Sequence, residues 1–256
     1  MRITTLGFFL ATILNGQLYK DPLLPESRTV HGIVVDQNGT PVREAEIGHA
    51  ATRIVPGSSA KANTDAQGRF QVTTNAPLIV LRKPGYASAF VRTRDTASGD
   101  EQKLVLKPIK RTLPRCSQTG KYETVEGWGA SFRFSPMPQI RVSKQGRDID
   151  YGIRGYYVET SKGKKGISHG SGPMWSFGAP LDSDVWKSVT FEEDSFEVDG
   201  SRILDSKGQW ADGTLWRTIG RFGETASYSQ VDEETAKVLN RFIDGVCISP
   251  LKGPGQ

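Results

Sequence analysis

His169 is the residue of the second half that best fits a catalytic role, because Ser and Asp residues lie near it in the sequence. Ser168 and Ser171 flank it, and Asp182 and Asp184 follow. A Ser-His-Asp hydrolase needs these groups in one spatial arrangement, and the G-x-S-x-G turn that often presents such a serine is missing. The run of Gly and Ser around His169 is more typical of a flexible loop. A hydrolase centred on His169 is therefore kept only as the second alternative.

Metal binding would require histidine, cysteine or carboxylate side chains at suitable spacing. The chain has three histidines, at His31, His49 and His169. None of them lies in an H-x-x-E or H-E-x-x-H pattern. Asp205, Lys207 and Asp212 resemble a calcium loop only loosely, since Lys207 stands where an oxygen ligand is needed. We therefore expect no metal, no cofactor and no catalytic activity.

All five tryptophans lie in the second half of the chain, at positions 128, 175, 186, 210 and 216. An indole ring offers a large flat face and one polar N–H, which suits stacking on a sugar ring. Trp128, Trp175 and Trp210 lie in loop-like sequence with Gly or Ser nearby, and they are the candidate ligand-binding residues. The competing interpretation is that these large aromatics fill the core of a domain with few long aliphatic runs.

Two cysteines, Cys116 and Cys247, bracket almost all of the second half. In an oxidising compartment such a pair is expected to form one disulfide that clamps the first and last elements of a domain. By the chain-entropy estimate, a loop of this size stabilises the fold by up to about 5 kcal/mol. The alternatives are two buried free thiols, or a catalytic cysteine with His169.

Composition indicates a globular chain of two ordinary domains. The 256 residues are 36% hydrophobic and 24% charged, and the net charge is +5. The densest basic clusters lie among Pro, Gly and Ser, which suggests solvated linker or loop tips. These clusters are Lys107, Lys110, Arg111 and Arg115, then Lys162, Lys164 and Lys165. They are not interleaved with aromatics on one face, so no nucleic-acid partner is expected.

The N-terminus has the pattern of an export signal. One positive charge at Arg2 precedes an apolar run from Ile3 to Leu14, which is too short to span a bilayer but has the length of a signal core. Residues 1–18 are therefore expected to be a signal peptide, which leaves a mature chain without a transmembrane span. The predicted location is the periplasm or the cell exterior. The alternative is an apolar first strand.

Residues 28 to 107 show short strand patterns separated by turns. The β-branched run Val30–Val35 leads into the turn Asp36–Pro41. A second turn has Asp65 placed to accept backbone hydrogen bonds and Gly68 able to adopt a left-handed conformation, followed by Phe70. Strands at intervals of roughly 8–12 residues, each closed by a turn, predict an antiparallel sandwich.

These motifs carry a resemblance to a known family. The pattern V-x-G-x-V-x-D-x-x-G-x-P-V begins at Val30, T-D-x-x-G-R-F begins at Thr64, and P-G-Y begins at Pro84. The segment 28–107 resembles the carboxypeptidase regulatory-like domain, a prealbumin-type sandwich. The resemblance implies a seven-stranded antiparallel β-sandwich and a non-catalytic module of exported proteins, sometimes grouped with carbohydrate-binding-like folds. It assigns no functional residue.

The second half is expected to be a β-rich (α+β) domain over residues 115–250, joined by a linker at 108–114. Its last element is a predicted helix at 230–246, with Ser229 as N-cap. Five apolar residues of this segment fall on one face and would cover a sheet. They are Val238, Leu239, Phe242, Ile243 and Val246. The whole chain is thus predicted to be mainly β with one α-helix at its end.

The function expected from these patterns is that of an exported, non-catalytic binding or interaction protein of the cell envelope. Its partner would be an unknown protein or an envelope polysaccharide. Carbohydrate binding through exposed tryptophans is the first alternative, and the hydrolase is the second.

Overall fold

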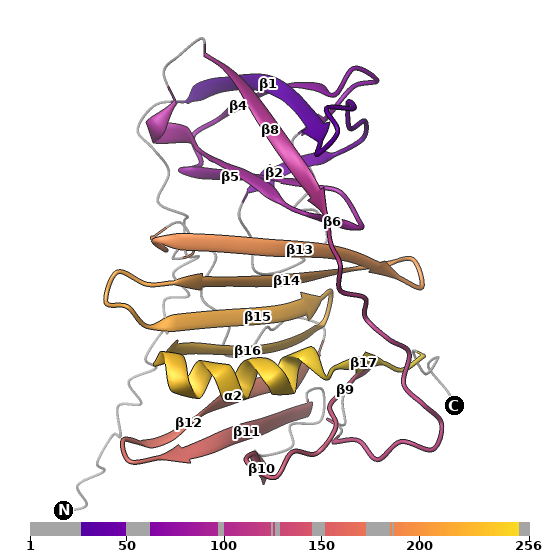
Figure 1. The fold of residues 1–256 in the computed structure, drawn as a ribbon, viewed down its shortest axis with the longest axis vertical. Helices are drawn as coiled ribbons and strands as arrows, with labels where there is room; N and C mark the ends of the chain where they lie inside the picture. Colours follow the sequence, from indigo (N-terminus) through magenta and orange to yellow (C-terminus); the bar gives the residue numbers. More distant parts are fainter. Residues whose placement is uncertain are drawn as a thin grey trace, which may run out of the picture.

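The computed structural model describes residues 27–49, 62–96, 100–123, 125, 129–144, 152–172, 185 and 187–250. The expected signal peptide at 1–18 lies outside these residues. The described chain is mainly β, as predicted, and its one long helix lies near the C-terminal end, before a last short strand (Figure 1).

The first half forms two facing sheets with a shared apolar core. Its elements are β1 (Arg28–Asp36), β2 (Glu46–His49), β3 (Ala62–Asn63), β4 (Arg69–Thr74), β5 (Leu78–Arg82), β6 (Tyr86–Ala87), β7 (Ala89–Arg92), a 3-10 turn (Thr93–Asp95) and β8 (Glu101–Pro108). One sheet has the order β3-β2-β5-β7, and β6-β8-β1-β4 lie in the other. Val34, Ile47, Leu81 and Leu106 are fully buried between the sheets. The described residues of this region form eight strands, against the seven that the resemblance implies, and β1 pairs with β8 in parallel.

The two predicted turns have the geometry that their residues favour. Asp36 Oδ1 accepts the amides of Asn38 and Thr40 at 2.8 and 2.9 Å. Asp65 Oδ1 likewise accepts two amides of its turn, and Gly68 has a φ of 73°. A Cβ at Gly68 would lie 2.4 Å from the Val34 carbonyl oxygen, so both the space and the conformation require glycine there.

Within the described residues, the second half adds seven strands to the sheet that contains β1. It also forms a separate two-stranded sheet and the helix α2. Its elements are β9 (Phe132–Arg133), β10 (Arg141–Lys144), β11 (Gly152–Thr160), β12 (Gly163–Ser171), β13 (Thr190–Val198), β14 (Ser201–Gln209), β15 (Leu215–Arg221), β16 (Glu224–Val231), α2 (Glu233–Asp244) and β17 (Cys247–Ile248). β9 pairs with β17. The large sheet has the order β10-β11-β12-β16-β15-β14-β13-β6-β8-β1-β4.

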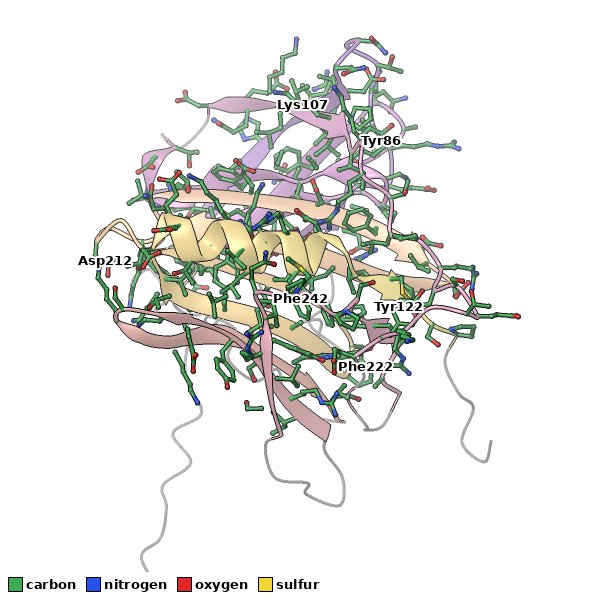
Figure 2. The ribbon with its side chains drawn as sticks, turned by 60° about the horizontal axis from the view of Figure 1, so that its bottom comes forward. Tyr86, Lys107, Tyr122, Asp212, Phe222 and Phe242 are labelled. Carbon is green, nitrogen blue, oxygen red and sulfur yellow. A yellow bond between two sulfur atoms is a disulfide. The ribbon has the colours of Figure 1, made fainter. Side chains whose placement is uncertain are left out.

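Helix α2 covers one face of this sheet, as its apolar stripe predicts (Figures 1 and 2). Phe242 is buried and its ring lies 4.8 Å from those of Phe134 and Tyr156. The N-cap is Asp232, whose Oδ1 accepts the Thr235 amide at 2.8 Å. The prediction of Ser229 as N-cap is wrong. β16 continues to Val231, so Ser229 still lies within the strand.

The two halves share one sheet because β6 pairs with β8 on one side and β13 on the other. A buried ion pair strengthens this junction: Arg82 of β5 donates Nε and Nη2 to the two oxygens of Glu193 in β13, at 2.6 and 2.9 Å. The hydroxyls of Ser88 and Ser206 also donate to Glu193, at 2.8 and 3.0 Å. Both oxygens of this buried carboxylate are therefore hydrogen-bonded: Oε1 accepts from Arg82 and Ser88 of the first half, and Oε2 accepts from Arg82 and from Ser206 of the second half.

The segment between the halves is packed against the second half, unlike the solvated linker expected at 108–114. Ile109 and Leu113 are half-buried against the core beneath α2. Further along, Cys116 forms the expected disulfide with Cys247, with a Cα–Cα distance of 4.9 Å. The Cys116 amide donates to Ile248 O at 3.0 Å, so backbone pairing and the disulfide hold this segment against β17.

Candidate functional site

His169 lies in the core and not on a loop. It belongs to β12, its side chain is fully buried, and its ring lies 5.2 Å from that of Phe134 and 6.2 Å from that of Tyr156. Neighbouring residues of a strand point to opposite faces, so Ser168 points away from the His169 side. Asp182 and Asp184 lie outside the described residues. The structure thus places His169 out of reach of any ligand dissolved in water.

The partner of His169 is Glu224, at 3.0 Å between Nε2 and Oε1. The same carboxylate accepts the amides of Ser131 and Phe132 at 2.7 and 2.8 Å, and Arg221 Nε at 3.1 Å. Burial opposes ionisation of Glu224, but these donors outweigh it and hold its pKa below the ordinary range. The cluster fixes the strand β9 to β16 and has a structural role.

Of the three candidate tryptophans, only Trp210 lies within the described residues. It is half-buried, its indole N–H donates to Ser229 Oγ at 3.1 Å, and its ring lies 5.8 Å from that of Trp216. Trp216 is a core residue with 1% of its surface exposed. Trp128 and Trp175 fall outside the described residues.

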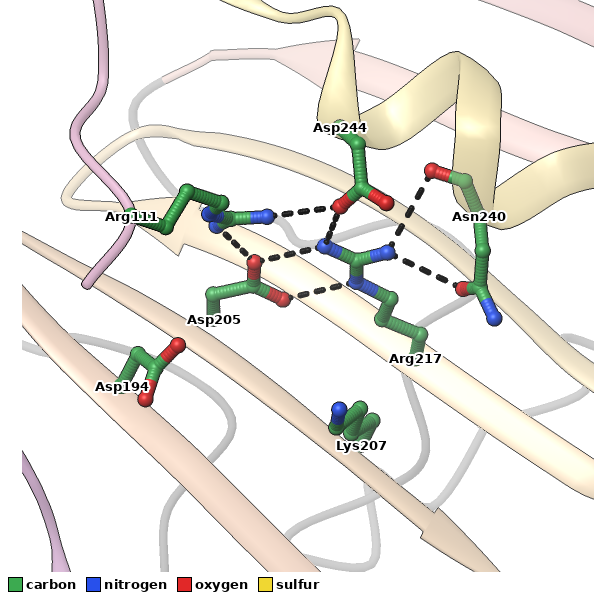
Figure 3. Close-up of a pocket in the computed structure, with 7 residues that line it drawn as sticks. All are labelled: Arg111, Asp194, Asp205, Lys207, Arg217, Asn240 and Asp244. Carbon is green, nitrogen blue, oxygen red and sulfur yellow. Dashed lines mark hydrogen bonds and ion pairs between the residues drawn. The ribbon is translucent and has the colours of Figure 1, made fainter. Parts of the chain in front are cut away.

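A charged pocket of about 210 Å³ lies between α2 and the sheet (Figure 3). We call it the α2 pocket. Three aspartates, three basic residues and one amide line it, and these come from β13, β14, β15, α2 and the segment after β8. The lining residues are Arg111, Asp194, Asp205, Lys207, Arg217, Asn240 and Asp244.

Arg217 organises the α2 pocket. Its Nε and Nη2 donate to the two oxygens of Asp205 at 2.9 and 2.8 Å, and Nη2 also donates to Asp244 Oδ1 at 2.6 Å. Nη1 donates to Asn240 Oδ1 at 3.0 Å. Arg111 contacts Asp205 as well and donates to Asp244 Oδ1 at 2.8 Å. Two guanidinium groups therefore hold two carboxylates in a fixed arrangement before any ligand is present.

The pKa values follow these contacts. Burial alone would raise the pKa of Asp205, but the hydrogen bonds and charges of Arg217 and Arg111 lower it. Burial, with the charge of Asp205 on the facing strand, raises the pKa of Asp194. The Asp194 carboxylate makes no hydrogen bond or ion pair with any residue that the structure describes. Both of its oxygens therefore remain available to a ligand.

Local patterns position these side chains, although no sequence motif links all of them. Asp205 and Lys207 are two apart in β14 and therefore share a face. Asn240 and Asp244 are four apart and share a face of α2. The sequence predicts a solvated linker at Arg111, and it relates Asp205 only to a loose calcium-loop pattern. Two local patterns could have indicated the pocket. The segment of β14 has charged residues at alternate positions, and the segment of α2 has polar residues beside its apolar stripe.

The α2 pocket is not a metal site by composition, because its carboxylates are interleaved with guanidinium groups. Within the described ranges, no group of three or more His, Cys, Asp or Glu residues is placed to hold a metal ion. No described helix has the length and hydropathy needed to cross a membrane. In comparisons with family models, curated proteins and solved structures, nothing matched this chain.

Proposed function

We propose that this chain is an exported, non-catalytic binding protein of the cell envelope that holds one unit of a polysaccharide in the α2 pocket. The observation that carries the proposal is the preformed set of charged and amide groups that converge there from five segments. Charged planar groups fixed by ion pairs present donors and acceptors in constant directions, and hydroxyl-rich ligands are recognised by such groups.

The size and lining of the α2 pocket favour a small polar unit. Its volume of about 210 Å³ is below the roughly 300–1,000 Å³ of pockets that enclose drug-sized ligands. Every lining residue is charged or carries an amide, so an acyl chain or an apolar peptide side chain would have to lie against charged and amide groups. One sugar unit at the end or side of a polymer fits both conditions.

A binding role accounts for the chemistry of the lining better than catalysis does. Asp205 and Asp244 are engaged by Arg111 and Arg217, so neither is free to act as nucleophile or general base. The lining residues include no hydroxyl, thiol or imidazole group. His169, the earlier candidate, lies buried in a different cluster.

Export is supported by two features outside the pocket. The disulfide between Cys116 and Cys247 suits an oxidising compartment. The resemblance of residues 28–107 to a carboxypeptidase regulatory-like domain points the same way, because such modules accompany exported proteins. The two facing sheets of that region are compatible with the seven-stranded sandwich that the resemblance implies, with one added strand.

Affinity electrophoresis through gels containing envelope and plant polysaccharides tests the proposal. We expect at least one polysaccharide to retard the protein, with retardation lost in Asp194→Ala and kept in Trp210→Ala. If retardation were lost in Trp210→Ala and kept in Asp194→Ala, the polysaccharide would bind at Trp210 and not in the α2 pocket. Unchanged mobility on every polysaccharide would contradict carbohydrate binding and leave a protein partner as the interpretation.

A further inference from the structure

The charges of the α2 pocket leave one carboxylate without a counter-ion. Arg111 and Arg217 pair with Asp205 and Asp244, two positive charges with two negative ones. Lys207 pairs with Glu192 at 3.0 Å, outside the pocket lining. The remaining charge is that of Asp194, which has no ion-pair partner among the described residues.

The pocket also retains hydrogen-bonding groups that no described residue uses. Asp244 accepts both of its hydrogen bonds through Oδ1, which leaves Oδ2 open. Asn240 Oδ1 accepts from Arg217 and from the Tyr228 hydroxyl, while its Nδ2 group has no acceptor among the described residues. A matching ligand would carry one positive group for Asp194 and hydroxyls that both donate and accept.

We propose that the α2 pocket is selective for an amino-sugar unit with an unacetylated amino group, and that the ammonium binds Asp194. The ring hydroxyls then meet Asn240 Nδ2 and Asp244 Oδ2. This inference rests on the proposed carbohydrate-binding function and narrows its ligand class. An acetylated amino sugar lacks the charge, and a neutral hexose leaves Asp194 with only neutral donors.

The proposal implies a pH dependence of binding. The groups facing Asp194 are Asp205 and Lys207 of β14, Arg217 of β15 and Arg111 of the segment after β8. Burial and Asp205 raise the pKa of Asp194, while the three basic residues lower it, and the net direction is upward. The carboxylate therefore becomes protonated at higher pH than an ordinary aspartate, and ammonium binding weakens as the pH falls through that value.

Calorimetric titration of the whole chain with glucosamine, N-acetylglucosamine and glucose tests the proposal. At about pH 6.5 an aliphatic ammonium stays protonated. We expect glucosamine to bind about tenfold more tightly than the other two sugars. In Asp194→Asn this preference should disappear, because the carboxamide carries no charge. Glu197→Gln is the matched control, since it removes the same charge from an exposed position of β13 on the opposite face from Asp194.

The outcomes separate this inference from the proposed function. Equal affinities for the three sugars, unaffected by Asp194→Asn, would overturn ammonium recognition, and so would equal losses in the Asp194 and Glu197 variants. Absence of glucosamine binding with polysaccharide retardation preserved would overturn ammonium recognition while the binding function stands. A preference for glucosamine that fades on acidification, and only in the protein with Asp194, supports the inference. Circular dichroism checks that each variant is folded.

Discussion

Glu224 is a buried carboxylate of the second half that accepts hydrogen bonds from two backbone amides and two side chains. Its carboxylate accepts from the amides of Ser131 and Phe132, from Arg221 and from His169, and it has no exposed surface. In Glu224→Gln, one carboxylate oxygen becomes an NH₂ group that faces donors. We expect a loss of about 3–5 kcal/mol in the free energy of unfolding, measured by urea denaturation, because Arg221 would be left without its counter-charge.

The pH dependence of stability provides a second measurement on the same residue. The pKa of Glu224 is lowered in the fold, so its contribution is complete above the unfolded value of about 4.3 and is lost as the pH falls through the folded value. The wild-type protein should therefore lose stability below about pH 4.3, and Glu224→Gln should show a shallower loss. Glu159→Gln, at an exposed position of β11, should follow the wild type. Parallel curves for all three proteins would exclude this role of Glu224.

At the scale of single residues, the sequence predicts turns well and sites poorly. Asp65 and Gly68 act within a few residues of each other, so local sequence contains all that determines their turn. His169 was a reasonable candidate by type, but its burial depends on Phe134 and Tyr156, which reach it only through the fold. Arg111 belongs to the α2 pocket through contacts with residues about 94–133 positions away, which no local pattern encodes.

Helix α2 contributes to the second half mainly through its apolar face. Phe242 is 1% exposed and contacts the rings of Phe134 and Tyr156, so Phe242→Ala would leave a cavity in the core. We expect a loss of about 3–5 kcal/mol in the free energy of unfolding. Phe222→Ala is the control, because Phe222 is 46% exposed and lies away from the core (Figure 2). Similar losses for both variants would show that α2 does not cover the core as described.

At the scale of elements, periodicity predicts the existence of an element better than its ends. The apolar stripe of the C-terminal segment predicts 230–246, and the helix is found at Glu233–Asp244. Ser229 and Asp232 are both good N-cap residues, so the choice between them depends on where β16 ends. The pairing of β16 with β15 extends to Val231, so the helix can begin only after that residue and Asp232 becomes its N-cap. Strand pairing across the sheet, which is not a local property, therefore sets the start of the helix.

For the whole molecule, the division into two sequence regions conceals a continuous sheet. Residues 28–107 and 115–250 differ in pattern, and two domains followed naturally from length and composition. The junction depends on β6, a strand of two residues, which pairs with β13 more than 100 positions later. A two-residue strand has no periodicity to detect. The buried ion pair between Arg82 and Glu193 also cannot be predicted from the sequence, because an arginine in a strand ordinarily faces water.

The ion pair between Arg82 and Glu193 makes this continuity testable. Replacing Arg82 by Met would leave Glu193 as a buried carboxylate without its counter-charge, and we expect a loss of about 3–5 kcal/mol in the free energy of unfolding. Arg69→Met is the matched control, since the Arg69–Glu101 pair has both side chains more than half exposed and should change stability by less than about 1 kcal/mol.

Scanning calorimetry measures the loss of stability in Arg82→Met and shows whether it affects one half of the chain or both. Because β6 and Glu193 connect the halves through backbone pairing and buried hydrogen bonds, the wild-type protein should unfold in one transition with equal calorimetric and van't Hoff enthalpies. Arg82→Met should move that single transition to lower temperature. If the halves were independent, the wild type would show two transitions, and Arg82→Met would shift only the one that belongs to residues 28–107. That result would return the chain to the two separate domains that its sequence suggests.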